Sequence, residues 1–306
     1  MGNAIAAIGE CMLELSADGQ GAWRLGHAGD TFNTLWTMRA LLTDRDADYV
    51  SAFGDDPFSE QQIAFLRENG IGTAASPKIA GARPGLYAIT LDGAERSFTY
   101  WRADSAARQL ASDPAALEKS LSDRALAYFS GITLAILDDA SRETLFDALR
   151  SARSRGTLVA FDPNHRPRLW QSANAAQDVI GQALALSDIA LPTFPDEQQL
   201  FGDASPEQTV ERLARAGVGE AVVKNGEDAA CLFTDGNIKS VPAIRVSDAV
   251  DTTGAGDSFN GAYLAARLLG HEPGEAAARA HRTAAAVIRV RGALAPFESL
   301  REAFAI

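Results

Sequence analysis

The chain has little cysteine and no long apolar run, and each of these features excludes a class of protein. Its two cysteines, Cys11 and Cys231, are too few and too scattered for a disulfide framework or a cysteine-based metal site. The first apolar stretch, Ala4 to Ile8, is too short for a secretory signal, and Glu10 interrupts it. No run approaches the ~18 apolar residues of a membrane-spanning helix. We therefore expect a cytoplasmic protein without a membrane partner.

The chain also lacks an excess of positive charge and the common nucleotide-binding signatures. Its net charge of −12 argues against nucleic acid as a partner, although a local group of arginines can still bind a small anion. The pattern G-x-x-x-x-G-K-[ST] is absent, and no G-x-G-x-x-G follows an early strand. The 306 residues show no internal repeat and no long linker. We expect one α/β domain over 1–306.

Strand and helix patterns alternate along most of the chain. Apolar runs predict strands at 4–9, 49–53, 126–130, 158–162, 189–191 and 221–224. Helical spacing predicts helices at 31–42 (with Asp30 or Thr31 as N-cap), 57–69, 138–155, 175–185, 206–216, 259–269 and 274–290. This rhythm predicts a doubly wound, mostly parallel sheet flanked by helices, with ligands at the carboxyl ends of its strands.

One segment breaks this rhythm. Residues 85–102 alternate in polarity around an Asp92-Gly93 turn, which predicts a β-hairpin. Because the hairpin lies between two α/β stretches, we expect it to belong to a small β-sheet lid, contributed mainly by about 10–28 and 78–104.

Residues 251–261 (DTTGAGDSFNG) are the most informative stretch. Three glycines and two carboxylates precede an apolar helical pattern. Glycines let the backbone approach an anion, and the N–H groups at a helix start favour negative charge. Asp257 can then take a proton from an attacking hydroxyl. The simpler alternative is a tight turn in which Asp257 caps a helix.

The whole of this string resembles the C-terminal signature of the PfkB (ribokinase-like) carbohydrate kinases, and the likeness extends from Ile8-Gly9-Glu10 to Gly292-Ala293. The resemblance implies a ribokinase-like fold, ATP and Mg²⁺ as cofactors, and Asp257 as the catalytic base. It also implies an anion hole that binds the nucleotide at Gly254, Ala255 and Gly256, and a homo-oligomer formed through the β lid.

Three further segments are similar to binding motifs of that family. Gly29, Asp30 and Asn33 resemble its sugar-binding segment, with Ala28 in place of a first glycine; the alternative is a helix cap and a solvated amide. Asp162 and Asn164 stand at the end of the predicted strand 158–162, where Asn164 can bind phosphate; the alternative is that both residues cap the next turn. At the end of the strand 221–224, the likeness implies Lys224, Asn225 and Gly226 as nucleotide-binding residues. Here Ala229 replaces a second glycine, and an ordinary β-turn after a strand is the alternative.

The metal-linked N-x-x-E motif of many family members is altered. Thr193 replaces the asparagine, and Asp196 or Glu197 supplies the acid that the resemblance links to Mg²⁺. An acidic cluster at a helix N-terminus explains the same residues without a metal.

Arginines beside aromatic residues suggest an anionic sugar. Tyr100 and Arg102 share one face of the predicted hairpin, Tyr87 lies on its partner strand, and Arg166 follows the strand 158–162. A cross-strand cation–π pair is the plainer explanation for the hairpin residues. Within the family the likeness is greatest to 2-keto-3-deoxygluconate kinases, in which residues matching Tyr87, Arg102 and Arg166 are implied to hold the substrate carboxylate.

The expected activity is thus ATP-dependent phosphorylation of a keto-deoxy sugar acid at its 6-hydroxyl. Two arginines aimed at a neutral polyol would remain unpaired when the lid closes, which is unfavourable. Two alternatives stay open: a fructokinase or another neutral-sugar kinase of the family, and a non-catalytic sugar-binding regulatory protein on the same fold.

Overall fold

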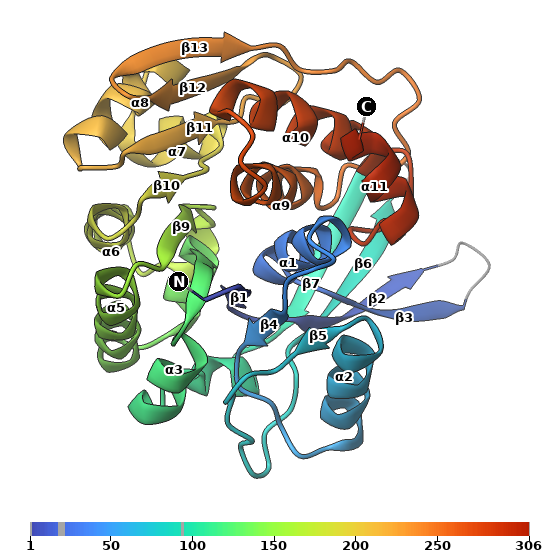
Figure 1. Ribbon diagram of the computed structural model, residues 1–306. Coiled ribbons are helices and arrows are strands. Elements are labelled where there is room, and N and C mark those ends of the chain that lie inside the picture. Colours follow the sequence, from blue (N-terminus) through green and yellow to red (C-terminus); the bar gives the residue numbers. More distant parts are fainter. Residues whose placement is uncertain (1, 18–21, 93–94, 306) are drawn as a thin grey trace.

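The computed structural model of the protein describes residues 2–17, 22–92 and 95–305. Within these residues the strands form one nine-stranded and one four-stranded sheet (Figure 1). The large sheet has the order β13-β12-β11-β10-β9-β8-β1-β4-β5 and is parallel except at β12 and β13. Its strands are β1 (Ala4–Ile8), β4 (Ala47–Val50), β5 (Ile71–Gly72), β8 (Arg124–Ser130), β9 (Leu158–Asp162), β10 (Ile189–Ala190), β11 (Glu220–Val223), β12 (Ala230–Thr234) and β13 (Asn237–Val241).

Helices cover both faces of this sheet (Figure 1). One layer contains α1 (Asp30–Leu41), α2 (Pro57–Glu68), α9 (Ala255–Leu268), α10 (Pro273–Val287) and α11 (Phe297–Ala305). The other contains α3 (Pro114–Ser120), α4 (Gly131–Ile136), α5 (Asp139–Ser154), α6 (Ala173–Ala185), α7 (Phe194–Phe201) and α8 (Pro206–Arg215). Two short 3₁₀ helices span Ala106–Gln109 and Pro167–Leu169.

The two layers follow from the period of the strands. In β1, Ile5 and Ala7 enter the core on the α1–α9 side, whereas Ala6 and Ile8 enter the core on the α5–α6 side. Successive side chains of a strand point to opposite faces, so a strand covered on both sides is apolar throughout. The predicted doubly wound fold is therefore confirmed.

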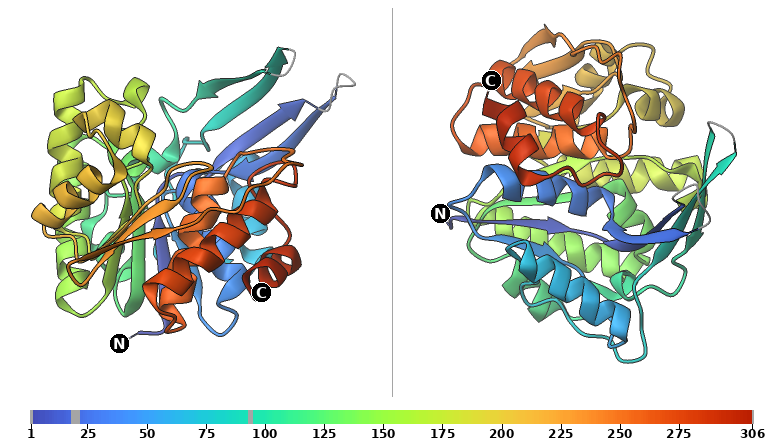
Figure 2. Two further views of the ribbon diagram at one scale, coloured as in Figure 1. Left: turned by 90° about the horizontal axis from the view of Figure 1, so that it is seen from above. Right: turned by 90° about the vertical axis from the view of Figure 1, so that its right-hand side faces the viewer.

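The four-stranded sheet lies at one side of the body and projects from it (Figure 2). Its order is β3-β2-β6-β7. The strands are β2 (Met12–Ala17), β3 (Trp23–Ala28), β6 (Leu86–Asp92) and β7 (Glu95–Trp101). The predicted hairpin is present as the antiparallel pair β6–β7. Gly93 of the predicted turn lies outside the described residues.

Several boundaries differ from the sequence prediction. Helix α9 begins at Ala255, four residues before the predicted start, because the G-A-G-D residues themselves take helical conformation after Gly254. The N-cap of α1 is Gly29, not Asp30 or Thr31, and no side chain caps that helix. The antiparallel hairpin β12–β13 was not predicted. No helix in the described part of the chain has the length and apolarity that crossing a bilayer requires.

Candidate active site

Asp257 lies in the first turn of α9, and a glycine fixes the start of that helix. Gly254 is the N-cap with φ of +74°, in the left-handed region. A Cβ added at Gly254 would lie 2.7 Å from the Cβ of Ala293. Both the backbone conformation and the close neighbour therefore require glycine here. The first N–H groups of a helix have no intrahelical acceptor, so residues 254–256 form a turn suited to an anion.

The start of α1 meets the start of α9 at Asp257. Asn33 Nδ2 donates to Asp257 Oδ2 at 2.8 Å, and Asn33 Oδ1 accepts from the Gly29 N–H at 3.3 Å. Thr34 Oγ1 donates to the Asp257 carbonyl at 3.1 Å. Burial and the nearby charge of Asp30 raise the pKa of Asp257 to about 7, although the Asn33 hydrogen bond opposes the rise. A carboxylate with that pKa can accept a proton near neutral pH.

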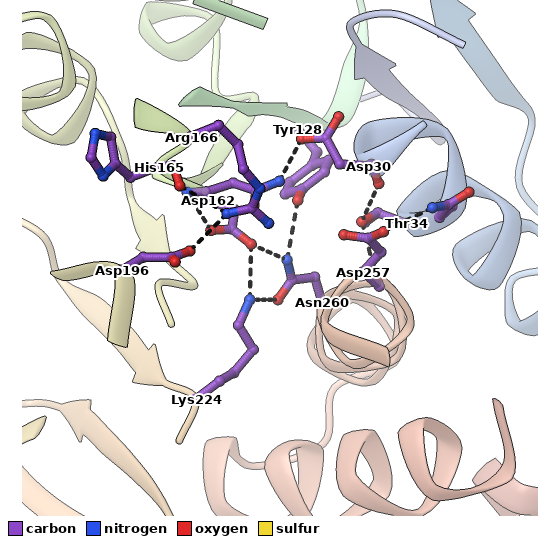
Figure 3. A network of polar contacts seen from close by, with 12 residues as sticks. Asp30, Thr34, Tyr128, Asp162, His165, Arg166, Asp196, Lys224, Asp257 and Asn260 are labelled. Atoms are coloured by element: carbon purple, nitrogen blue, oxygen red, sulfur yellow. Dashed lines mark hydrogen bonds and ion pairs between the residues drawn. The ribbon is translucent and has the colours of Figure 1, made fainter. Parts of the chain in front are cut away.

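A second polar group lies where β9 and β11 end. Asp162 Oδ2 accepts from Lys224 Nζ at 2.8 Å and from Asn260 Nδ2 at 2.7 Å. Lys224 also donates to Asn260 Oδ1 at 2.7 Å. Figure 3 shows these three side chains converging from the ends of β9 and β11 and from α9, the helix that also carries Asp257. The strand-end rule identified Asp162 and Lys224 in the sequence, but Asn260, one helical turn after Asp257, was missed.

The loop after β9 brings two more predicted residues to this place. Asn164 Nδ2 donates to Asp30 Oδ2 at 2.8 Å, so these two predicted ligands contact each other. Arg166 is half exposed and pairs with Asp196 at 3.1 Å. In Figure 3 a dashed line joins the guanidinium of Arg166 to Asp196. Burial raises the pKa of Asp196, and the charge of Arg166 opposes this.

Asp196 and Glu197 both lie in the first turn of α7 but have different partners. Glu197 is fully buried, and Arg212 Nη2 lies 2.5 Å from its Oε2. Arg212 also pairs with Asp203 at 2.6 Å. Burial raises the pKa of Glu197 to about 7, with Arg212 opposing it. Among the described residues no three His, Cys, Asp or Glu side chains are grouped as a ready metal site.

The nucleotide-loop residues form the turn between β11 and β12. Gly226 has φ of +60°, and the Asp228 N–H donates to the Asn225 carbonyl at 3.0 Å. The backbone of Lys224 is joined to the segment before α7 through its contacts with Pro192 and Phe194. These backbone hydrogen bonds join Lys224 to the segment that leads into α7, the helix that carries Asp196.

The lid residues have carboxylate partners that sequence reasoning missed. Arg102 Nη2 donates to Glu10 Oε2, and Tyr87 OH donates to Glu14 Oε2. Glu10 is 3% exposed and follows β1, so the pair joins the large sheet to the lid. Glu10 stands at the end of a predicted strand, as Asp162 and Lys224 do, but its pairing with Arg102 was not predicted.

Two neighbours connect these lid residues with the rest of the site. A Cβ added at Gly29 would lie 2.1 Å from the Glu10 carbonyl, so Glu10 borders the start of α1. Tyr87 packs in a small apolar cluster that includes Ala293, the neighbour of Gly254. Tyr100 stacks obliquely near Tyr87, with ring centroids 5.7 Å apart, and is half exposed. Glu10 and Ala293 thus connect Arg102 and Tyr87 with the starts of α1 and α9.

Known proteins are similar to this chain in sequence and in fold. The model of the pfkB family carbohydrate kinases matches residues 3–300. A protein of Dickeya dadantii (strain 3937) named 2-dehydro-3-deoxygluconokinase is 42% identical over 304 residues, covering 97% of this chain and 98% of its own length. The protein of that name from Escherichia coli (strain K12) is also 42% identical, with 98% and 99% coverage.

Solved structures agree on the fold. The apo form of a putative ribokinase II from E. coli superimposes with a TM-score of 0.86 at 23% identity, covering 98% of both chains. This likeness shows a ribokinase-like fold. The family model covers nearly the whole chain. The chain belongs to the pfkB family of carbohydrate kinases.

Proposed function

We propose that the chain is an ATP- and Mg²⁺-dependent kinase of 2-dehydro-3-deoxygluconate (2-keto-3-deoxygluconate). It would phosphorylate the 6-hydroxyl and release 2-dehydro-3-deoxy-6-phosphogluconate and ADP. Family membership supports a sugar kinase, and relatives at 42% identity over nearly the full length carry this activity in their names. The entire chain 1–306 would act as one catalytic unit, with the four-stranded sheet as its lid.

The observation that carries the proposal is the environment of Asp257, which raises its pKa and orients its side chain. Its pKa of about 7 and its bond to Asn33 give an oriented base at the N-terminus of α9. The sugar hydroxyl would lose its proton to Asp257 as it attacks the terminal phosphoryl group. The N–H groups of Gly254, Ala255 and Gly256 would stabilise the charge on the transferred group.

On the donor side, the turn 224–226 and Asn164 would bind the ATP phosphates. Asp196 fits a role near Mg²⁺, because its oxygens are of the type that the ion prefers and its side chain remains accessible. Glu197 fits that role less well, since Arg212 already binds its buried carboxylate. When bound, Mg²⁺ would neutralise phosphate charge. We therefore propose Asp196 as the acid on the metal side.

On the sugar side, Gly29, Asp30 and Asn33 would bind hydroxyl groups. Arg166, Arg102, Tyr87 and Tyr100 would surround the carboxylate. Within the described residues, Nε of Arg102 is buried without a hydrogen-bond partner. An unsatisfied buried donor is unfavourable by about 1–3 kcal/mol. The carboxylate of a sugar acid would satisfy this donor, whereas Glu10 already balances part of the charge of Arg102.

A coupled ADP-release assay over a substrate panel tests the proposal. We expect kcat/KM for 2-dehydro-3-deoxygluconate to exceed that for fructose and ribose by at least ~10²-fold, as expected for about 3 kcal/mol of discrimination. Equal or better use of fructose would favour the neutral-sugar kinase. ATP turnover with none of the sugars would favour the non-catalytic protein.

We also propose that two copies pair through the lid. The strand register places Leu25, Leu15, Leu13, Leu86 and Trp101 on one face of the lid. Leu25 and Trp101 are 45% and 56% exposed. An exposed apolar face of this kind marks a contact surface. Sedimentation should show a dimer in the wild type and a monomer after Leu25→Glu. We further propose a cytoplasmic location, where ATP is available as co-substrate.

A further inference from the structure

Three nearly buried side chains form a closed triangle of hydrogen bonds beside the proposed base. Lys224 Nζ lies 2.8 Å from Asp162 Oδ2 and 2.7 Å from Asn260 Oδ1. Asn260 Nδ2 completes the triangle with its 2.7 Å bond to Asp162 Oδ2. Their exposed fractions are 7% for Lys224, 3% for Asp162 and 0% for Asn260. An ammonium group held from two sides in this way has little freedom to move.

The outer contacts of the triangle fix its orientation. The second Nδ2 proton of Asn260 is directed at Tyr128 OH at 3.1 Å, so the amide oxygen is the atom left for Lys224. Asp162 Oδ1 accepts from the Asn164 N–H at 2.9 Å. Strands β8 and β9, the residue that follows β11 and helix α9 each contribute to the network, and Figure 3 shows how they converge.

The ammonium group lies directly beneath the turn that we assign to the phosphates. A Cβ added at Gly256 would be 3.9 Å from Lys224 Nζ. A lysine ammonium has three N–H donors, and the bonds to Asp162 and Asn260 use two of them. One donor remains for an acceptor bound at the turn.

We propose that Lys224 is a catalytic residue that contacts the transferring phosphoryl group, and that Asp162 and Asn260 are positioning residues that hold its ammonium group beneath the start of α9. The inference rests on the proposed function. A bond forms between the sugar hydroxyl oxygen and the γ-phosphorus, and the bond from that phosphorus to the β–γ bridging oxygen breaks. The hydroxyl proton passes to Asp257, and the third N–H of Lys224 stabilises a phosphoryl oxygen throughout.

A purely structural ion pair is the competing explanation. Buried ion pairs are often no more stabilising than well-packed apolar residues of the same volume, so stability alone gives weak reason for this arrangement. A structural pair would also need no donor beneath the phosphate turn. The two explanations differ in what they predict for nucleotide binding, because only a phosphoryl contact makes the γ-phosphoryl group contribute to affinity.

The charges around Asp257 come from several elements. Asp30 of α1 and Asp162 of β9 are negative, and Lys224 after β11 is positive; Arg166, in the loop after β9, is engaged by Asp196. Burial and then Asp30 raise the pKa of Asp257, Asp162 adds to the rise, and Lys224 opposes it. Removing Lys224 should therefore raise the pKa of Asp257 further, and removing the charge of Asp162 should lower it.

The first arm of the test measures nucleotide binding by calorimetry. Lys224→Met should weaken a non-hydrolysable ATP analogue by ~10-fold or more, as expected for a lost charged hydrogen bond. Binding of ADP should change much less, because ADP lacks the γ-phosphoryl group. Equal losses for the two nucleotides would overturn the phosphoryl contact.

The second arm titrates Asp257 in the free protein by carboxyl-carbon NMR, with Asp257→Asn assigning the signal. The pKa of Asp257 should move up in Lys224→Met and down in Asp162→Asn, and stay near the wild-type value in Lys224→Arg. Shifts in the same direction for the first two variants, or no shift, would overturn the electrostatic role. Lys239→Met, at an exposed position of β13, is the matched control and should change neither nucleotide binding nor the pKa of Asp257.

These outcomes separate the inference from the proposed function. Opposite shifts in a protein that phosphorylates no sugar acid would leave the charge arrangement standing and remove the proposed substrate. A wild type that phosphorylates the sugar acid, with Lys224→Met keeping wild-type kcat, would remove the catalytic role of Lys224 while the proposed function stands.

Discussion

Replacing Asp257 with asparagine should make the protein both inactive and more stable. The folded protein holds the Asp257 proton more tightly than the unfolded chain does, because the pKa rises from 3.8 to about 7 on folding. Native stability is therefore lost as the pH rises through that interval. At pH 8 the raised pKa lowers the stability of the folded protein by as much as ~4 kcal/mol, and at pH 5 by only ~1–2 kcal/mol.

The substitution also removes a favourable interaction between the Asp257 charge and the dipole of α9. A negative charge in the first turn of a helix contributes about 0.3–1 kcal/mol, which Asp257→Asn loses. The asparagine can still accept the bond from Asn33. We therefore expect a net gain of about 3 kcal/mol at pH 8 and little gain at pH 5. Turnover should fall by at least ~10²-fold, with sugar binding nearly unchanged.

Urea unfolding at both pH values, together with steady-state kinetics, measures these effects. Asp139→Asn is the matched control, because Asp139 also lies in the first turn of a helix but its side chain is 99% exposed. It should change stability by less than ~0.5 kcal/mol and leave turnover intact. An Asp257→Asn enzyme with wild-type turnover would remove Asp257 as the base. No pH-dependent gain over the control would show that its pKa is not raised.

Three further changes test the clamp and the turn. Arg102→Ala should destabilise the protein by about 3–5 kcal/mol in urea unfolding, because buried Glu10 loses its partner. The double variant Glu10→Gln/Arg102→Met should recover most of the lost stability. An equal loss of stability in both variants would refute the stabilising role of the pair. Arg166→Ala should raise KM for the sugar acid ~10–100-fold without altering the fold, whereas Arg168→Ala, exposed in the same loop, should not. Gly254→Ala should cost at least ~1 kcal/mol of stability and weaken ATP binding in calorimetry, because of its positive φ and the Ala293 contact; unchanged values would contradict that geometry.

Much of the fold follows from the sequence because the central strands are buried on both faces. Each reads as a short apolar run, as in β1, β8 and β9, and the helices between them carry clear caps such as Asp138 before α5. The hairpin β12–β13 was missed although Asp235-Gly236 marks its turn, with φ of 50° and 75°. Its outer strand is largely exposed and lacks an apolar run.

The site was predictable in its residues but not in its pairings. Asp257, Lys224 and Asp30 could be identified because they stand at strand ends or glycine turns. Their partners could not, since Asn33 and Asp257 are separated by 224 residues in the sequence. Glu10 illustrates the consequence: a buried carboxylate 92 residues away already binds the arginine expected to hold the substrate. Only the tertiary structure shows how much of that charge remains for a ligand.

A crystal structure with a non-hydrolysable ATP analogue and 2-dehydro-3-deoxygluconate tests the central claim most directly. The account predicts the 6-hydroxyl at hydrogen-bond distance, about 2.6–3.2 Å, from an oxygen of Asp257. It also predicts the sugar carboxylate in contact with the guanidinium of Arg166. A different hydroxyl at Asp257, or a carboxylate directed away from Arg166 and Arg102, would contradict it.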